Sequence, residues 1–138
     1  MRLPEPPADG PPVRASKRYL SLAKNAALHR DPARFALLYR LLWRLQRNLR
    51  IMEDKADPDV RRLEELDKNV RRDSHKMHAF VRFRQVEEEG GAEHYVAWFE
   101  PEHHILRANA GFFRRRFASM RWSILTPQGT LHWDGETM

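Results

Sequence analysis

The 138-residue sequence contains no cysteine, which excludes disulfides, thiol catalysis, iron–sulfur clusters and cysteine-based zinc sites. It also lacks long hydrophobic runs. The longest, Phe35–Tyr39, is far shorter than the about 20 apolar residues that a membrane span needs, and the first residues, Met1–Pro7, contain no apolar stretch of signal-peptide length. We therefore expect a cytoplasmic protein without a membrane segment.

Charge is abundant, and most of it is positive. Twenty-five Lys and Arg residues against 19 Asp and Glu give a net charge of +6, which favours an anionic partner. The 41% hydrophobic residues are sufficient for one core. Five of the nine prolines lie in residues 1–13, which predicts a flexible tail or linker there and a single domain over residues 14–138.

Hydrophobic periodicity predicts helices over residues 16–29, 32–50, 58–77 and 101–118. Pro32, Pro58 and Pro101 each follow an acidic residue, and proline suits the first position of a helix. The predicted buried stripe of the second helix is Phe35, Leu38, Leu42, Leu45 and Leu49. That of the third helix is Val60, Leu63, Leu66, Val70 and Met77.

From His78 onward the period changes to two, which predicts strands. Residues 79–84 and 94–99 are predicted to form a hairpin around the loop Glu87–Gly91. A second predicted hairpin joins residues 120–125 and 130–133 through the turn Thr126–Gly129. This order predicts an α+β domain with a four-stranded antiparallel sheet that helices cover on one face.

Residues 14–50 contain ten Lys or Arg residues and one acidic residue, a net charge of +9. Such clustering suits contacts with nucleic-acid phosphates, which contribute affinity without reading the base sequence. The residues predicted to make these contacts are Arg40, Arg44 and Arg47, on the outer face of the second helix. The alternatives are a solvated face whose arginine stems cover apolar surface, and a membrane-surface helix.

A dense polar segment lies where the third helix leads into the first strand. Its predicted binding residues are Arg71, Arg72, His75, Lys76 and His78. The arginines and the lysine would hold phosphates, and the histidines would donate hydrogen bonds or transfer protons; alternatively, the basic residues only complement the helix dipole. The two histidines have the spacing of a helical metal pair, but no known metal motif accompanies them, so we expect no metal and no cofactor. Asp73–His75 are contiguous, which is poor geometry for a catalytic triad.

A second basic and aromatic cluster occupies Phe112–Phe117, close to Trp122. Proteins that bind single strands combine arginines on the backbone with aromatic rings that stack on bases, which makes Arg114 and Arg115 further binding candidates. The alternative is that the phenylalanines belong to the core and that these arginines are solvated.

Three stretches of the sequence, Val70–Phe83, Trp98–Leu106 and Trp122–Gly135, carry a resemblance to a known family. Over about residues 26–136 the chain resembles a bacterial domain of unknown function, catalogued among "probable DNA metabolism" proteins. The resemblance implies a setting in DNA repair, where the domain is fused ahead of uracil-DNA-glycosylase-like, uracil-DNA-binding domains or stands alone with a radical-SAM partner. It implies no catalytic residues.

The sequence lacks the water-activating motif and the late His-Pro-Ser-type motif that glycosylases of this superfamily carry. We therefore expect an accessory part of a DNA-repair protein, which binds nucleic acid or a catalytic partner through its basic surfaces. One alternative is an enzyme that processes nucleotides or nucleic acid with His75, Lys76 and His78. Another is a module that binds an acidic protein.

Overall fold

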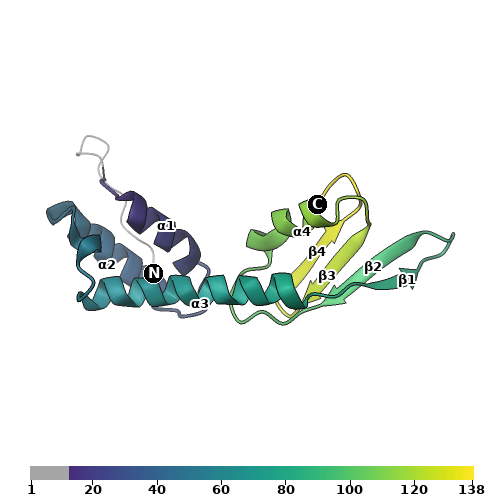
Figure 1. The fold of residues 1–138 in the computed structure, drawn as a ribbon, viewed down its shortest axis with the longest axis horizontal. Coiled ribbons are helices and arrows are strands. Elements are labelled where there is room, and N and C mark those ends of the chain that lie inside the picture. The colour runs from purple at the N-terminus through teal and green to yellow at the C-terminus, as the bar shows by residue number, and fades with distance from the viewer. Residues whose placement is uncertain (1–12) are drawn as a thin grey trace. The chain divides into compact units, whose positions relative to one another are not determined.

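The computed structural model describes residues 13–138 (Figure 1). The chain divides into two compact units, a first unit up to Val70 and a second unit Arg71–Met138. Nearly all of the predicted tail, residues 1–12, lies outside the described residues, and the single-domain boundary stays a prediction. Within residues 13–138, none of the helices has both the length and the apolar character needed to cross a membrane.

The first unit is helical. It contains α1 (Lys17–Ala26), α2 (Arg34–Arg47), the short 3₁₀ helix η1 (Ile51–Glu53) and the first part of α3 (Pro58–Phe80). The side chain of Ser16 caps α1 by accepting a hydrogen bond from the Tyr19 amide at 3.0 Å. The Asp57 carboxylate caps α3, as its position before Pro58 predicts, by accepting from the Asp59 and Val60 amides at 2.9 and 3.3 Å.

The predicted start of α2 at Pro32 is wrong by two residues. The Asp31 carboxylate accepts a hydrogen bond from the Ala33 amide at 2.9 Å, which closes a turn there, and the helix begins only at Arg34.

The core of the first unit joins α1, α2, η1 and α3. Its buried residues are Tyr19, Leu22, Ala26, Leu37, Leu41, Leu45, Ile51, Met52, Val60, Leu63 and Leu66. The predicted stripe of α3 is confirmed in full. The predicted stripe of α2 is partly wrong, since Leu37 and Leu41 are buried, whereas Phe35 and Leu49 are about half exposed. Apolar residues occur on several sides of α2, so that more than one stripe fits helical periodicity, and packing selects one.

The second unit contains the end of α3 and all the strands. These are β1 (Arg84–Glu87), β2 (Glu93–Trp98), β3 (Trp122–Thr126) and β4 (Gly129–Trp133), with the 3₁₀ helix η2 (Arg107–Asn109) and α4 (Ala110–Arg116) between β2 and β3. The sheet has the order β1-β2-β3-β4. The α+β class is therefore confirmed, but the all-antiparallel sheet is wrong, because β2 and β3 are parallel. The connection through η2 and α4 is a crossover, which parallel neighbours require.

Two element boundaries also differ from the prediction. Helix α3 continues to Phe80, and the first strand begins at Arg84 rather than near His78, because the alternating residues 79–83 are also compatible with a last helical turn. The fourth helix begins at Ala110 rather than Pro101. The buried Asp73 carboxylate accepts a hydrogen bond from the His103 amide at 2.8 Å, which holds the segment after Pro101 in irregular structure.

The two faces of the sheet differ in character. Helix α4 lies over one face (Figure 1), where Phe113 packs against the Trp122 ring with centroids 6.2 Å apart. The register places Arg84, Val96, Ser123 and His132 in one row across all four strands. Because side chains alternate along a strand, this row belongs to the face opposite the buried Ile124.

Candidate functional site

Two of the three predicted arginines of α2 are engaged in ion pairs. Arg40 donates from Nε and Nη2 to both carboxylate oxygens of Asp59, at 2.9 and 2.8 Å. Arg44 pairs with Asp57 and donates to Asp59 at 3.0 Å. The guanidinium groups hold the pKa of both carboxyls below their usual range. Arg40 and Arg44 thus connect α2 to the start of α3, and their charge is already compensated.

Arg47 has a different environment. Its guanidinium lies 5.8 Å from the centroid of the exposed Trp43 ring, a cation–π contact. It forms no ion pair within the part of the chain that the structure describes. Of the arginines predicted on α2, Arg47 therefore retains its charge for an external anion.

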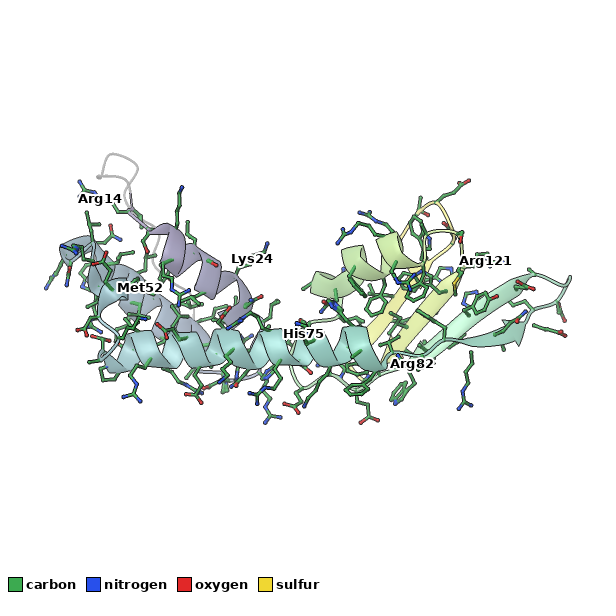
Figure 2. The ribbon with its side chains drawn as sticks, viewed as in Figure 1. Arg14, Lys24, Met52, His75, Arg82 and Arg121 are labelled. Atoms are coloured by element: carbon green, nitrogen blue, oxygen red, sulfur yellow. The ribbon has the colours of Figure 1, made fainter. Side chains whose placement is uncertain are left out.

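The predicted residues at the end of α3 lie within the second unit, and their environments differ. Arg71, Arg72, His75 and Lys76 are exposed, and His75 is labelled on α3 in Figure 2. The Lys76 ammonium lies 3.9 Å from Glu102 Oε1.

His78 is the residue of this group whose side chain packs against other elements of the second unit. Its Nε2 atom hydrogen-bonds to Asn109 Oδ1 at 2.6 Å, and its ring stacks on Phe112 with centroids 3.7 Å apart. The same Asn109 donates to Ser74 Oγ at 3.1 Å. His78 thus joins α3 to η2 and α4, whereas the four exposed residues remain open to solvent.

The three sequence stretches that carry the family resemblance meet at the backbone of His103. The amide of His103, in the second stretch, donates to Asp73 of the first stretch at 2.8 Å. Its carbonyl accepts from Gln128 Nε2 of the third stretch at 3.0 Å. The polar residues of these stretches therefore hold the second unit together.

Arg114 and Arg115 are exposed on α4, and neither is in an ion pair among residues 13–138. Phe113 between the helix and the sheet is buried, as the structural alternative expected.

A groove in the second unit gathers aromatic and basic side chains that the sequence analysis did not select. It has a volume of about 690 Å³, and its lining contains no acidic residue. Phe80 and Trp98 contribute rings that are 66% and 58% exposed. Two arginines line it, Arg82 and Arg84, of which Arg82 lies where α3 leads into β1 (Figure 2). Arg82 donates to the carbonyls of Ala79 and Val81, at 2.6 and 3.0 Å.

A serine–histidine cluster lies on the face of the sheet that carries Arg84. It consists of Glu88, His94, Ser123 and His132. Ser123 Oγ lies 2.9 Å from His94 Nε2 and 2.8 Å from His132 Nδ1. His94 is buried, and its Nδ1 atom makes no hydrogen bond among the described residues but lies 3.3 Å from Glu88 Oε1. A buried nitrogen without a partner beside a carboxylate is unusual, and such groups concentrate at functional sites.

The family model for a domain of unknown function, DUF4130, matches residues 32–134, which is most of the chain. The chain belongs to the DUF4130 family. Neither the curated proteins nor the solved structures gave a match. Both the groove and the serine–histidine cluster of this DUF4130 domain lie within the matched residues.

The sequence contained a signal for the groove. Residues 79–84 and 94–99 alternate between two sets of side chains. The set that contains the arginines consists of Phe80, Arg82, Arg84, His94, Val96 and Trp98. Five of these six line the groove. No comparable signal in the sequence marks the serine–histidine cluster, because its four residues come from separate elements.

Proposed function

We propose that this DUF4130 domain is the accessory, nucleic-acid-binding part of a DNA-repair protein, and that the groove holds a single strand. The observation that carries the proposal is the composition of the groove: two arginines, two exposed aromatic rings and no carboxylate. Proteins that bind single strands use this combination, with cations on the backbone phosphates and aromatic rings under the bases.

The two arginines keep their charge available to a phosphate. Arg82 is held by backbone carbonyls, which orient the guanidinium without neutralising it. The Arg84 side chain has no hydrogen-bond or ion-pair partner among residues 13–138. They contrast with Arg40 and Arg44, whose carboxylate partners would have to be displaced. Each phosphate that a cation neutralises releases counterions, which favours binding at low salt.

The exposed rings suit stacking. The indole Nε1 of Trp98 donates to Glu100 Oε1 at 3.1 Å, which restrains the ring. Stacking of a base on an aromatic side chain contributes about 1–3 kcal/mol, and it tolerates any base because each has a π-face. The groove therefore fits a sequence-tolerant contact with unpaired bases.

The repair setting rests on the family resemblance, which associates such domains with uracil-DNA-glycosylase-like domains or a radical-SAM partner. The excess of basic residues over residues 14–50 supports the proposal, because it attracts a polyanion over a longer range. Further phosphate contacts of the same kind would come from Arg47, from the four exposed residues Arg71, Arg72, His75 and Lys76 of α3, and from the arginines of α4.

The test is a titration of a fluorescent oligothymidylate with the whole chain at several salt concentrations. The double variant Arg82→Gln/Arg84→Gln should bind more weakly, with a salt slope shallower by about 0.7 for each lost phosphate contact. Trp98→Ala should weaken binding about 5- to 150-fold, the equivalent of one stacking contact, with the slope unchanged. The charge-matched control is Arg61→Gln/Arg107→Gln, at two exposed arginines that do not line the groove. Binding that falls equally in the control and the groove variants would refute the groove as the site.

A further inference from the structure

When His94 is neutral, the carboxylate of Glu88 favours one of the two possible arrangements of protons in the serine–histidine cluster. A carboxylate only accepts hydrogen bonds, so the His94 Nδ1 atom that faces Glu88 carries the ring proton, and Nε2 is the acceptor. Ser123 has a single hydroxyl proton, which it donates to His94 Nε2. The contact between Ser123 Oγ and His132 Nδ1 is then a donation from His132.

This arrangement matches the roles of an activated serine nucleophile. In such sites an acceptor nitrogen of histidine takes the hydroxyl proton, and a carboxylate on the other nitrogen fixes the tautomer and stabilises the cation that forms. In this structure Glu88 Oε1 and His94 Nδ1 lie 3.3 Å apart but are not aligned as a hydrogen bond. Catalytic hydrogen bonds are often long before substrate is bound.

The nucleophile lies in the same row of the sheet as the groove arginine. Arg84 pairs with Val96, Val96 with Ser123, and Ser123 with His132. Neighbouring strands are about 4.8 Å apart, so the Cα atoms of Arg84 and Ser123 are separated by about 10 Å. Val96 between them lines the groove, whereas Ser123 is buried beside it, so a phosphodiester that reaches Ser123 must enter from the groove past Val96.

From this geometry we infer that Ser123 is a nucleophile towards phosphodiesters, with His94 as its general base and Glu88 as the positioning residue of that base. The choice of a phosphodiester rests on the proposed function, because it is the groove arginine that would hold the phosphate beside the serine. The assignment of Ser123 as a nucleophile does not depend on the proposed function.

The step conserves atoms and charge. Ser123 Oγ forms a bond to phosphorus, and its proton passes to His94 Nε2. The bond from phosphorus to the leaving oxygen breaks, and that oxygen departs with the electron pair. The product is a phosphodiester of Ser123. After His94 has lost its proton to solvent, a water oxygen bonds to phosphorus and gives a proton to His94 Nε2, while the bond from phosphorus to Ser123 Oγ breaks and Oγ regains its proton from His94.

The experiment uses bis(p-nitrophenyl) phosphate, a phosphodiester with a good leaving group, and the whole chain without nucleic acid. The measurements are the release of p-nitrophenolate and the mass of the Ser123 peptide. The wild-type protein should release nitrophenolate above a protein-free blank and gain one nitrophenyl phosphate on Ser123.

The charged groups around His94 are few in this part of the sheet. Glu88 faces it from the loop after β1, His132 stacks on it from β4 with centroids 5.3 Å apart, and Arg121 reaches Glu88 at 3.5 Å. Hydrogen bonds from the Thr137 and Glu136 amides lower the pKa of Asp134 to about 2, and His132 adds a smaller contribution of the same sign. Glu88→Gln should therefore lower the rate, since it removes the carboxylate nearest to the base.

Ser123→Ala should abolish release and the mass gain, and His94→Gln should slow release about 100-fold or more, the usual contribution of a general base. Glu88 is partly exposed, so that Glu88→Gln tests the assignment without removing a buried side chain. Ser119→Ala, at an exposed serine, is the matched control and should react as wild type.

Two outcomes overturn the inference. One is a folded wild-type protein, with a cooperative melting transition, that releases no more nitrophenolate than the blank. The other is a Ser123→Ala variant that reacts as wild type. Failure of this experiment leaves the strand-binding titration unaffected, and failure of that titration leaves the reaction of Ser123 unaffected, so the two proposals are separable.

Discussion

Asp57 combines two stabilising roles that a pair of substitutions can separate. Its carboxylate caps α3 by accepting from two backbone amides, and it pairs with Arg44 of α2. Loss of a helix N-cap costs about 1 kcal/mol, with a range of about 0.5–2 kcal/mol. The Arg44 side chain is 37% exposed, and an ion pair exposed to that degree contributes about 0.2–1 kcal/mol after screening by solvent.

Asp57→Ala removes both roles, so we expect a loss of about 1–3 kcal/mol in the free energy of unfolding. Asp57→Asn keeps a side-chain oxygen that caps about as well as aspartate but removes the charge, and we expect a loss of about 0.2–1 kcal/mol. Urea unfolding followed by far-ultraviolet circular dichroism measures both. Glu53→Gln, at an exposed pair with Arg50, is the control and should change little.

Equal destabilisation by the two substitutions would refute the assignment of the cap, because the asparagine retains it. An alanine variant as stable as wild type would refute both roles together.

Three further predictions follow from the contacts described above. The pKa values of Asp57 and Asp59 are lowered in the folded protein, so the stability that they contribute is complete above the unfolded value of about 3.9; in acid titrations it should be lost as the pH falls through the folded values. His78→Gln should lower the melting temperature, because His78 bonds to Asn109, whereas the exposed His75→Gln should not; equal melting temperatures would contradict this. The purified chain should release no uracil from DNA above a protein-free control.

Much of the first unit could be predicted because local signals and packing agree there. Asp57 before Pro58 marked the start of α3, and a single apolar stripe on that helix left one choice of buried face. The stripe of α2 could not be resolved, because Leu37 and Phe35 both continue a helical pattern, and only the neighbouring helices decide between them.

The second unit depends more on contacts between distant residues. The parallel pairing of β2 with β3 is set by the path of the chain through η2 and α4, which no local pattern encodes. The Asp73 carboxylate accepts a hydrogen bond from the amide of His103, 30 residues away in the sequence. This contact holds the segment after Pro101 in irregular structure, so the predicted helix begins later in the chain.

The candidate site could likewise be predicted only where a local sequence pattern contains its residues. The alternation near β1 and β2 contained the residues of the groove. The sequence did not indicate that the Arg40 side chain forms an ion pair and that the Arg84 side chain does not, because this depends on the positions of carboxylates in space. The contact between Ser123 and His94 joins two strands that are far apart in the sequence.

Within the described residues β1 is an edge strand that pairs with β2 alone, so one of its sides leaves backbone amides and carbonyls unpaired, and all four of its residues are exposed. Such an edge is a template on which the strand of another molecule can add, and natural sheets discourage this with short strands and charged side chains. β1 has only four residues and carries Arg84 at one end and Glu87 at the other. A variant that replaces Arg84 with an apolar residue would therefore promote self-association through the exposed edge.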